Sequence, residues 1–396
     1  MPRPLIIVIL ALIAEGLAHE LVFGDEDAAS NDTPQLIQVT EGLFDPTDPR
    51  TLGLPTIPGE HTVLYRATED SYKFCHHANI GIFKDQMYVM WSNGILPEDH
   101  NGQRVLYSTT SDGVEWSEPA VLAPDPDGLE GRLACVAAGF HADSDTLVAY
   151  SSAIVGGQPI HQDNSLYYQT SADGRNWSSP KRLAEGFFIE SPRRLPGGRL
   201  LMNGQRVNRQ PLLMYSDDSD GISGWQDADI PAMTDGSFIF PEPTWFVRRD
   251  GTVVMLFRTQ AKQADAFIYA STSTDNGASW TKPAKTNFPD ASARICAGNL
   301  PDGSAYVINN PSHVPGTIYK FIGRRNPLTI AISRDGITFD RAYVIRNRET
   351  SPRFPGENKL PGWQYPAAMF WQDHLYVGYS INKEDEGVTR IAISDL

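Results

Sequence analysis

The 396-residue sequence lacks the short motifs that most often bind metals or phosphates. It contains no Gly-rich phosphate loop, no HExxH zinc motif and no CxxC pair. Its three cysteines, Cys75, Cys135 and Cys296, are an odd number without metal-ligand spacing, so we expect buried thiols rather than disulfides. We therefore predict no metal and no cofactor, with a structural Ca²⁺ held by loop carboxylates left open as an alternative.

Positive charge and long apolar runs are also scarce. The chain has 33 Lys and Arg against 48 Asp and Glu, a formal net charge of −15, which argues against a nucleic-acid partner. The apolar run at residues 5–13 is too short to span a bilayer, follows Arg3 and precedes small residues. This layout predicts a signal peptide at residues 1–18, a secreted or periplasmic location and no membrane partner, and we expect a monomer.

No stretch keeps a helical period over three turns, whereas one short turn motif recurs along the chain. The motif runs Ser/Thr, Asp, Gly, aromatic, and its copies recur about every 50 to 60 residues, an interval typical of propeller blades. The copies end at Trp116, Trp177, Trp225, Trp280 and Phe339. Strands of alternating polarity flank them, as in "RVLYSTT" and "AFIYASTS".

These repeats predict an all-β fold made of a single β-propeller, with six blades favoured and seven as the alternative. We place the propeller at residues 60–396, after an N-terminal extension at residues 19–59, and expect the last strand to join N-terminal strands and close the ring. The repeated Asp accepts backbone N–H bonds, the Gly supplies a positive φ and the aromatic packs between sheets. The motif is therefore a folding device and not a catalytic one.

The repeats resemble the Asp boxes of the sialidase (neuraminidase) superfamily, and the resemblance covers residues 60–396. "PEPTWFVRRDGTVVMLFR" is similar to the sialidase segment that places a Glu before a strand ending in Arg, which matches Glu242 and Arg258. "GRRNPLTIAISRDG" is similar to the segment with a second substrate-binding Arg, which matches Arg325. "GWQYPAAMFWQDHLYVGYS" lies where sialidases have their nucleophilic Tyr, which matches Tyr365.

The first strand departs from the sialidase pattern. Sialidases have an Arg-Ile-Pro strand there, whereas this chain has His76 and His77 in "YKFCHHANIGIFKDQMYVMWSNG". This stretch looks like the branch that includes ulvan-lyase-type polysaccharide lyases and the rhamnosidase and rhamnose–glucuronate lyase families. The resemblance implies a uronate-containing glycan and central roles for His, Tyr and Arg.

Elimination beside a uronate needs a cation for the carboxylate, a base and an acid. Arginine, histidine and tyrosine suit these roles in that order. The candidate catalytic residues are His76, His77, Tyr365 and Glu242. Because adjacent residues of a strand point to opposite faces, we expect only one of the two histidines to face the pocket.

The candidate substrate-binding residues are arginines at strand ends and one loop aspartate. The arginines would form a positive funnel in an acidic protein. The loop "NGILPEDHNGQR" carries Glu98, Asp99 and His100 where sialidases have their acid/base Asp, and Glu190 is a weaker extra carboxylate. The set is Arg104, Arg206, Arg258, Arg325 and Asp99.

These residues predict a secreted enzyme that cleaves glycosidic bonds in an acidic, uronate-containing polysaccharide or oligosaccharide. We expect β-elimination, as in a polysaccharide lyase. An exo-acting glycoside hydrolase of the sialidase or rhamnosidase type is the first alternative. A non-catalytic glycan-binding propeller is the second, because a fold does not fix a function.

Overall fold

The computed structural model describes residues 36–128, 131–155, 163–259, 267–311, 323–357 and 359–396. Within this part of the chain, strands form six four-stranded antiparallel sheets and one two-stranded sheet. The prediction of an all-β propeller with six blades is therefore confirmed. The signal peptide predicted at residues 1–18 lies outside the described residues. No helix in the described part of the chain is long and apolar enough to cross a membrane.

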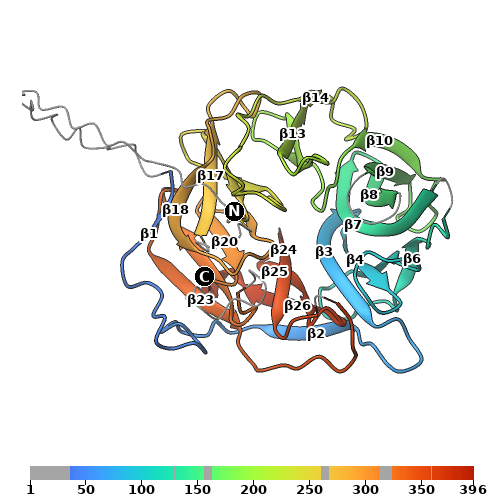
Figure 1. Ribbon diagram of the computed structural model, residues 1–396, viewed down its shortest axis with the longest axis horizontal. Helices are drawn as coiled ribbons and strands as arrows, with labels where there is room; N and C mark the ends of the chain where they lie inside the picture. The colour runs from blue at the N-terminus through green and yellow to red at the C-terminus, as the bar shows by residue number, and fades with distance from the viewer. Residues whose placement is uncertain (1–35, 129–130, 156–162, 260–266, 312–322, 358) are drawn as a thin grey trace, which may run out of the picture. The chain divides into compact units, whose positions relative to one another are not determined.

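The first three blades follow one another along the chain, each built from four consecutive strands (Figure 1). In each blade the first strand lies nearest the ring axis. Blade 1 consists of β3 (Phe74–Phe83), β4 (Gln86–Gly94), β5 (Arg104–Thr110) and β6 (Ala120–Ala123). Blade 2 consists of β7 (Arg132–Asp143), β8 (Thr146–Val155), β9 (Asp163–Ser171) and β10 (Lys181–Glu185). Blade 3 consists of β11 (Arg193–Arg194), β12 (Leu200–Gln205), β13 (Pro211–Ser216) and β14 (Gln226–Asp227).

The last three blades complete the ring, and the final one takes a strand from the N-terminal part of the chain. Blade 4 consists of β15 (Thr244–Val247), β16 (Val253–Phe257), β17 (Phe267–Ser273) and β18 (Ala284–Pro289). Blade 5 consists of β19 (Cys296–Asn299), β20 (Ala305–Asn309), β21 (Leu328–Ser333) and β23 (Arg341–Arg346). Blade 6 consists of β24 (Trp363–Trp371), β25 (His374–Ile381), β26 (Asp385–Ala392) and β2 (Glu60–Tyr65), before a short 3-10 helix, η2 (Ile393–Asp395).

Pairing between β2 and β26 closes the ring, as the sequence predicted. The two strands are antiparallel from Glu60–Arg390 to Tyr65–Glu386, and Figure 1 shows them side by side. The segment before β2 also packs on the propeller, since β1 (Gln38–Val39) pairs with β22 (Thr338–Phe339). Together these contacts tie the N-terminal part of the described chain to blades 4, 5 and 6.

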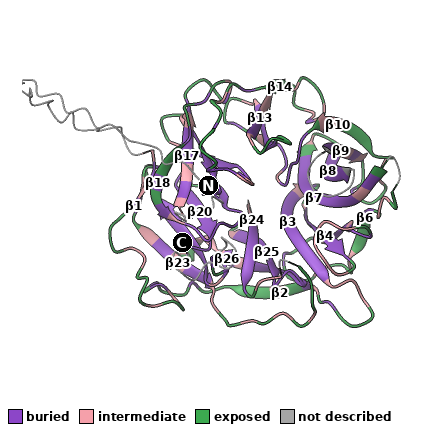
Figure 2. Ribbon diagram, in the orientation of Figure 1, coloured by how far each residue is buried: buried purple, intermediate pink, exposed green. Residues whose placement is uncertain are grey.

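Inner strands are buried on both faces, whereas outer strands alternate between buried and exposed residues. Nearly every residue of β3 is buried, but β18 alternates, and Figure 2 shows the same contrast around the ring. The three cysteines are buried free thiols, as expected. A strand buried on both faces has no water to solvate polar groups, so each polar side chain on an inner strand needs a protein or ligand partner.

The Asp-box turns lie at one end of the blades and pack neighbouring blades together. Asp112 Oδ1 accepts the backbone N–H groups of Val114 and Glu115, and these bonds hold the pKa of Asp112 below its usual range. Gly113 has φ 74°, and a Cβ there would lie 1.9 Å from the Tyr376 hydroxyl of blade 6. These contacts support the view that the motif is a folding device.

Candidate active site

Residues from blades 1, 4, 5 and 6 meet at the end of the propeller opposite the Asp boxes. Inner strands β3 and β24 begin at this end, and antiparallel pairing brings the β4–β5 loop and the β25–β26 turn to the same end. The Asp-box turns follow the third strand of a blade, so they lie at the far end. The ring therefore gathers side chains that are far apart in the sequence around its axis.

Both histidines of blade 1 lie beside Tyr365. The ring centroids of His76 and Tyr365 are 3.7 Å apart, and those of His77 and Tyr365 are 5.4 Å apart. The expectation that only one histidine faces this region was wrong, because a β-bulge interrupts the alternation. His76 pairs with Ser92 and Asn79 with Met90, so two residues of β3 oppose one of β4, and His77 has φ 60°.

Tyr365 occupies a second bulge at the same depth of the ring. In β24, Gln364 pairs with Ser380 and Ala367 with Gly378, which leaves Tyr365 and Pro366 opposite one residue. Tyr365 has φ 59°, a left-handed conformation that a tyrosine adopts only where its surroundings enforce it. The bulge turns the phenol toward blade 4.

The Tyr365 hydroxyl is held between a carboxylate and a guanidinium. It donates a hydrogen bond to Glu242 Oε1 at 2.9 Å and accepts one from Arg258 Nη1 at 2.6 Å. Arg258 Nη1 also lies 2.6 Å from Glu242 Oε2. The backbone N–H of Arg258 donates to the carbonyl of Pro241, so the proline-flanked Glu242 and the end of β16 are fixed side by side.

Burial controls the charges of this trio. Burial raises the pKa of Tyr365 well above its usual value, and the nearby Arg258 opposes this only in part, so the phenol is protonated at neutral pH. Burial by itself lowers the pKa of Arg258, but the charge of Glu242 outweighs it and raises that pKa. The trio is thus a neutral phenol bonded to a buried ion pair.

Arg325 and Lys383 add two more cations around the Tyr365 ring. The guanidinium carbon of Arg325 and the ammonium of Lys383 each lie 5.5 Å from the ring centroid. Arg325 donates to Gln364 Oε1 at 3.3 Å and to the Ser292 carbonyl at 3.4 Å, and burial lowers its pKa. Two buried cations beside one ring form a region suited to an anionic group.

Sequence reasoning missed Lys383. It lies in the β25–β26 turn, where Asn382 and Lys383 both have φ 57° and the Glu384 N–H donates to the Ile381 carbonyl. This turn points the lysine at the ring axis, where Lys383 Nζ donates to Glu98 Oε2 at 2.6 Å. The signal was the Asn-Lys pair between two alternating strands, which indicates a tight hairpin turn.

Two carboxyl groups have pKa values raised into the range of general acids. Burial, then the charge of Glu98, raises the pKa of Asp99 to about 7. Burial likewise raises the pKa of Asp290 to about 6, although Asn309 and the Ala293 N–H donate to it. Asp290 was also missed, because nothing local distinguishes it from a turn aspartate.

Among the residues that the structure describes, one trio of side chains could hold a metal ion. Ligand atoms of His76, His77 and Glu98 lie within 4.8 Å of one another, and His76 Nε2 is 3.5 Å from Glu98 Oε1. Burial and then the charge of Lys383 lower the pKa of His76 well below its usual value, so the imidazole is neutral. The ammonium of Lys383 on the same carboxylate opposes a second cation.

The other two candidate arginines contact side chains outside the Tyr365 trio. Arg206 is on the surface, where its side chain is 45% exposed and pairs with Asp227 at 2.5 Å. Arg104 donates to Asn93 and stacks on Tyr72 at 4.1 Å. The predicted funnel of four arginines therefore reduces to Arg258 and Arg325, because a place at a strand end does not determine where a side chain points.

Two weaker candidates also have other contacts. Glu190 is tied by Asn203 and Thr244 and lies 3.5 Å from Arg193, so its oxygens are occupied by a structural network. His100 contacts the backbone carbonyl of Glu98 and stays on the loop.

Comparisons with known proteins agree with this architecture. The family model for the BNR repeat-like domain matches residues 85–377. Among solved structures, a sialidase superposes with a TM-score of 0.62 at 18% identity, over 90% of this chain and 35% of that one. A Trypanosoma rangeli sialidase mutant with trans-sialidase activity gives 0.64 at 13% identity, over 86% and 60% of the two chains. A Dyadobacter fermentans protein of unknown function gives 0.64 at 16% identity, over 86% and 100%.

The family model, rather than the structural matches, identifies the family of this chain. No curated protein matches the sequence. The chain spans about a third of the length of the first sialidase and 60% of the trypanosomal one. At such low identity the likeness shows a shared fold, whereas the family model covers most of the chain. The protein therefore belongs to the BNR repeat-like domain family and has a sialidase-like six-bladed propeller.

Proposed function

We propose that the protein is a glycosidase that acts on an acidic sugar and uses Tyr365 as its nucleophile. The observation that carries this proposal is the position of the Tyr365 hydroxyl between Glu242 and Arg258. A phenol is a weak nucleophile unless a base removes its proton, and Glu242 Oε1 is within hydrogen-bond reach of that proton. Both the sialidase and the Trypanosoma rangeli sialidase mutant with a similar fold favour the same chemistry.

In the first step the phenolic oxygen attacks the anomeric carbon while its proton passes to Glu242. The raised pKa of Tyr365 requires that this proton leave as the new C–O bond forms, since a free phenolate is costly in the buried site. Asp99 has a pKa of about 7, so it is protonated below that pH and can give its proton to the departing glycosidic oxygen. The products are a glycosyl–tyrosine intermediate and a free alcohol.

In the second step water attacks the same carbon and the bond to Tyr365 breaks. Asp99, now ionised, takes a proton from the water, and the phenolic oxygen regains its proton from Glu242. Two displacements at one carbon retain its configuration. Arg258 stays paired with Glu242 in the resting state and faces the phenolic oxygen as it gains and loses charge.

The preference for an acidic sugar comes from Arg325 and Lys383. Both are buried cations beside the Tyr365 ring, and burial lowers the pKa of each. Lys383 is already paired with Glu98, whereas Arg325, within the part of the chain that the structure describes, donates to two uncharged acceptors, an amide and a carbonyl. A sugar carboxylate would give Arg325 the anionic partner that its planar fork matches.

Elimination is the second candidate function, and the histidine pair favours it. His76 and His77 pack against Tyr365, where a lyase would need a base and an acid. The pKa shifts favour hydrolysis over elimination. Burial lowers the pKa of His76, which makes it a weak base, and raises the pKa of Tyr365, which keeps the phenol protonated. Asp99, with a pKa of about 7, suits an acid/base that works near neutral pH.

A substrate panel tests both candidates in one assay. Purified protein would be incubated with sialosides, glucuronans, ulvan and arabinogalactan, and two products would be followed. New reducing ends without the ultraviolet absorbance of an unsaturated uronate support the hydrolase, whereas that absorbance supports elimination and refutes the nucleophilic role of Tyr365. Binding without either product, on a substrate of this panel, would support the non-catalytic propeller. The variant Tyr365→Phe is the matched control for contaminating activity.

A further inference from the structure

A basic hollow lies between blades 5 and 6, at the same end of the ring as Tyr365. It has a volume of about 330 Å³. Its walls come from β2, the end of β23, the segment after β23 and the β25–β26 hairpin. Four arginines line it, Arg66, Arg346, Arg348 and Arg353, against two carboxylates, Glu349 and Asp385. This balance is the reverse of that of the whole chain, with 33 basic and 48 acidic residues.

Among the described residues, Arg353 is the one of these four arginines that pairs with carboxylates. Arg353 pairs with Asp385 and lies 3.5 Å from Glu384 Oε2, and it also donates to the Ala67 carbonyl. Asp385 Oδ1, which contacts Arg353, also accepts the backbone N–H of Ala67, so this oxygen is committed to one edge of the hollow. These contacts fix one wall of the hollow, and Asp385, one of its two carboxylates, is paired with Arg353.

Arg346 forms the floor of the hollow. Its guanidinium carbon lies 4.0 Å from the centroid of Trp363 and 6.0 Å from that of Tyr379. Burial lowers the pKa of Arg346, Tyr379 opposes this in part, and the neighbouring charge of Arg348 lowers the pKa further. Burial and then Arg346 also lower the pKa of His61 to about 4, so His61 adds no charge at neutral pH.

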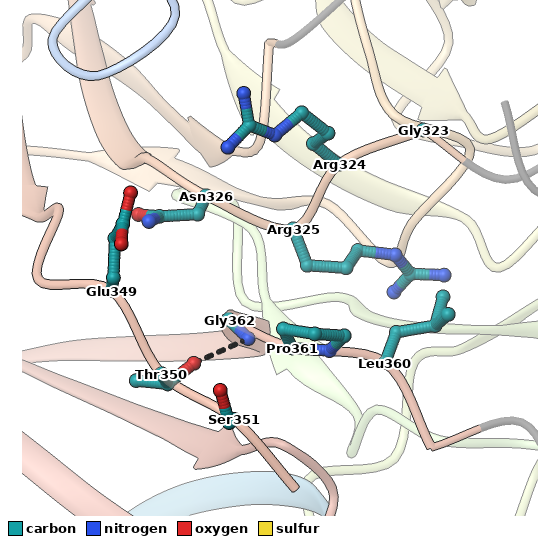
Figure 3. Close-up of a pocket in the computed structure, with 10 residues that line it drawn as sticks. All are labelled: Gly323, Arg324, Arg325, Asn326, Glu349, Thr350, Ser351, Leu360, Pro361 and Gly362. Atoms are coloured by element: carbon teal, nitrogen blue, oxygen red, sulfur yellow. Dashed lines mark hydrogen bonds between the residues drawn. The ribbon is translucent and has the colours of Figure 1, made fainter. Parts of the chain in front are cut away.

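A second hollow links this basic hollow to the proposed catalytic centre. It has a volume of about 370 Å³ and shares Glu349, Thr350 and Ser351 with the first. Figure 3 shows these three residues along one side and Arg325 on the other, with its side chain pointing away from Glu349. Thr350 Oγ1 accepts the Gly362 N–H, the bond drawn in Figure 3, and also donates to Asn382, which precedes Lys383 in the hairpin turn.

We propose that the hollow lined by Arg66, Arg346 and Arg348 binds an anionic group, a carboxylate or a sulfate, on a neighbouring sugar of the same glycan chain that reaches Tyr365. This inference rests on the proposed function and extends it, because it makes the substrate a polyanionic chain rather than a single acidic sugar on a neutral one. The shared wall at residues 349–351 gives the chain a path along the surface. Arginine is suited to both anions because its fork donates two parallel hydrogen bonds.

Direct binding tests the hollow without relying on catalysis. The protein variant Tyr365→Phe would be titrated calorimetrically with a polygalacturonate oligosaccharide, a dextran sulfate oligosaccharide and neutral dextran. The carboxylate and sulfate probes distinguish the two anions, and we expect one of them to bind with an affinity that falls as salt rises. Binding of dextran as tight as that of both anionic probes would overturn the proposal.

The double variant Arg66→Gln/Arg348→Gln, in the Tyr365→Phe background, locates the site. Both residues are exposed, so the change should leave the fold intact, and affinity should fall about tenfold for two partly solvated charge contacts. Arg206→Gln is the matched control, because Arg206 is an exposed arginine on blade 3 and its loss should leave affinity unchanged. Equal affinity in the double variant and the control would refute this hollow as the site.

The two proposals fail separately. If the wild-type protein cleaves no substrate but the double variant loses affinity for the anionic probe, the catalytic proposal fails and the anion site stands. If cleavage proceeds with the same KM for long and short acidic substrates in wild type and double variant, the anion site fails and the catalytic proposal stands.

Discussion

The variant Tyr365→Phe, which removes only the hydroxyl oxygen, distinguishes a catalytic role of Tyr365 from a structural one. In Tyr365→Phe the ring still packs against His76, and Glu242 and Arg258 keep their direct contact of 2.6 Å. The variant therefore leaves no charge unpaired. The lost bonds are one from the phenol to Glu242 and one from Arg258 to the phenol. Because both partners are charged, at about 1.5–3 kcal/mol for each bond, we expect the free energy of unfolding to fall by about 3 kcal/mol or somewhat more.

The expected loss of activity is far larger. Removal of a general acid or base typically costs about 10²- to 10⁴-fold in kcat, whereas removal of a nucleophile that acts as a unit with its base costs up to about 10⁶-fold. Loss of more than roughly 10⁴-fold would identify Tyr365 as the nucleophile. A smaller loss, with an unsaturated product in the wild type, would assign it to proton transfer in an elimination.

The assay pairs single-turnover kinetics with chemical denaturation of the same protein preparation. Mass spectrometry of wild-type protein quenched with a slow substrate should detect a glycosyl group on the peptide that contains Tyr365. If Tyr365→Phe keeps more than about a tenth of the activity, the difference in barrier is under about 1.4 kcal/mol and the nucleophile assignment is wrong.

Three further predictions follow from the same contacts. Glu242→Gln should destabilise the protein by about 3–5 kcal/mol, because it leaves Arg258 buried without its carboxylate partner. Urea denaturation measures this loss, and little change would mean that the Glu242–Arg258 pair is solvated. Activity should fall as pH rises through about 7, where Asp99 ionises, and Asp99→Asn should remove this limb of the pH–activity profile. The pKa of Asp99 is higher in the folded than in the unfolded protein. The stability that Asp99 contributes is therefore present below its unfolded pKa and is lost as pH rises toward 7. Prolonged dialysis against a chelator should leave activity unchanged, since Lys383 already neutralises Glu98. A loss of activity that one divalent ion restores would instead assign a metal to His76, His77 and Glu98.

The fold could be predicted because its signal is local. Each Asp box uses the chemistry of a few neighbouring residues, so Asp112 and Gly113 behave in the structure as the turn motif requires. The repeat interval then sets the number of blades. The grouping of Glu242, Arg258 and Tyr365 came from motif resemblance, and their contacts depend on a ring that closes through β2.

Other parts of the site depend on long-range pairing and could not be predicted. The bulge at His77 exists only in the register between β3 and β4, which the sequence of β3 alone does not specify. Lys383 and Asp290 become buried because different blades converge on the axis. Arg206 carries the same "GQR" signature as Arg104, yet it points outward to Asp227.

The bulges explain how a narrow ring end can hold so many functional groups. A regular inner strand presents every second side chain to the axis, but the bulges at His77 and Tyr365 turn consecutive residues to one side. Left-handed backbone also occurs at Asp99, Glu242 and Lys383, at a cost of about 1–3 kcal/mol each. Such strain persists only where surrounding structure enforces it, and the buried inner strands of a closed ring supply that constraint. Replacing His77 by glycine should relieve this backbone strain, but it also removes a buried imidazole that is hydrogen-bonded to Ser92. The lost packing and hydrogen bond cost more than the roughly 1–3 kcal/mol of strain, so urea denaturation should show a net loss of stability.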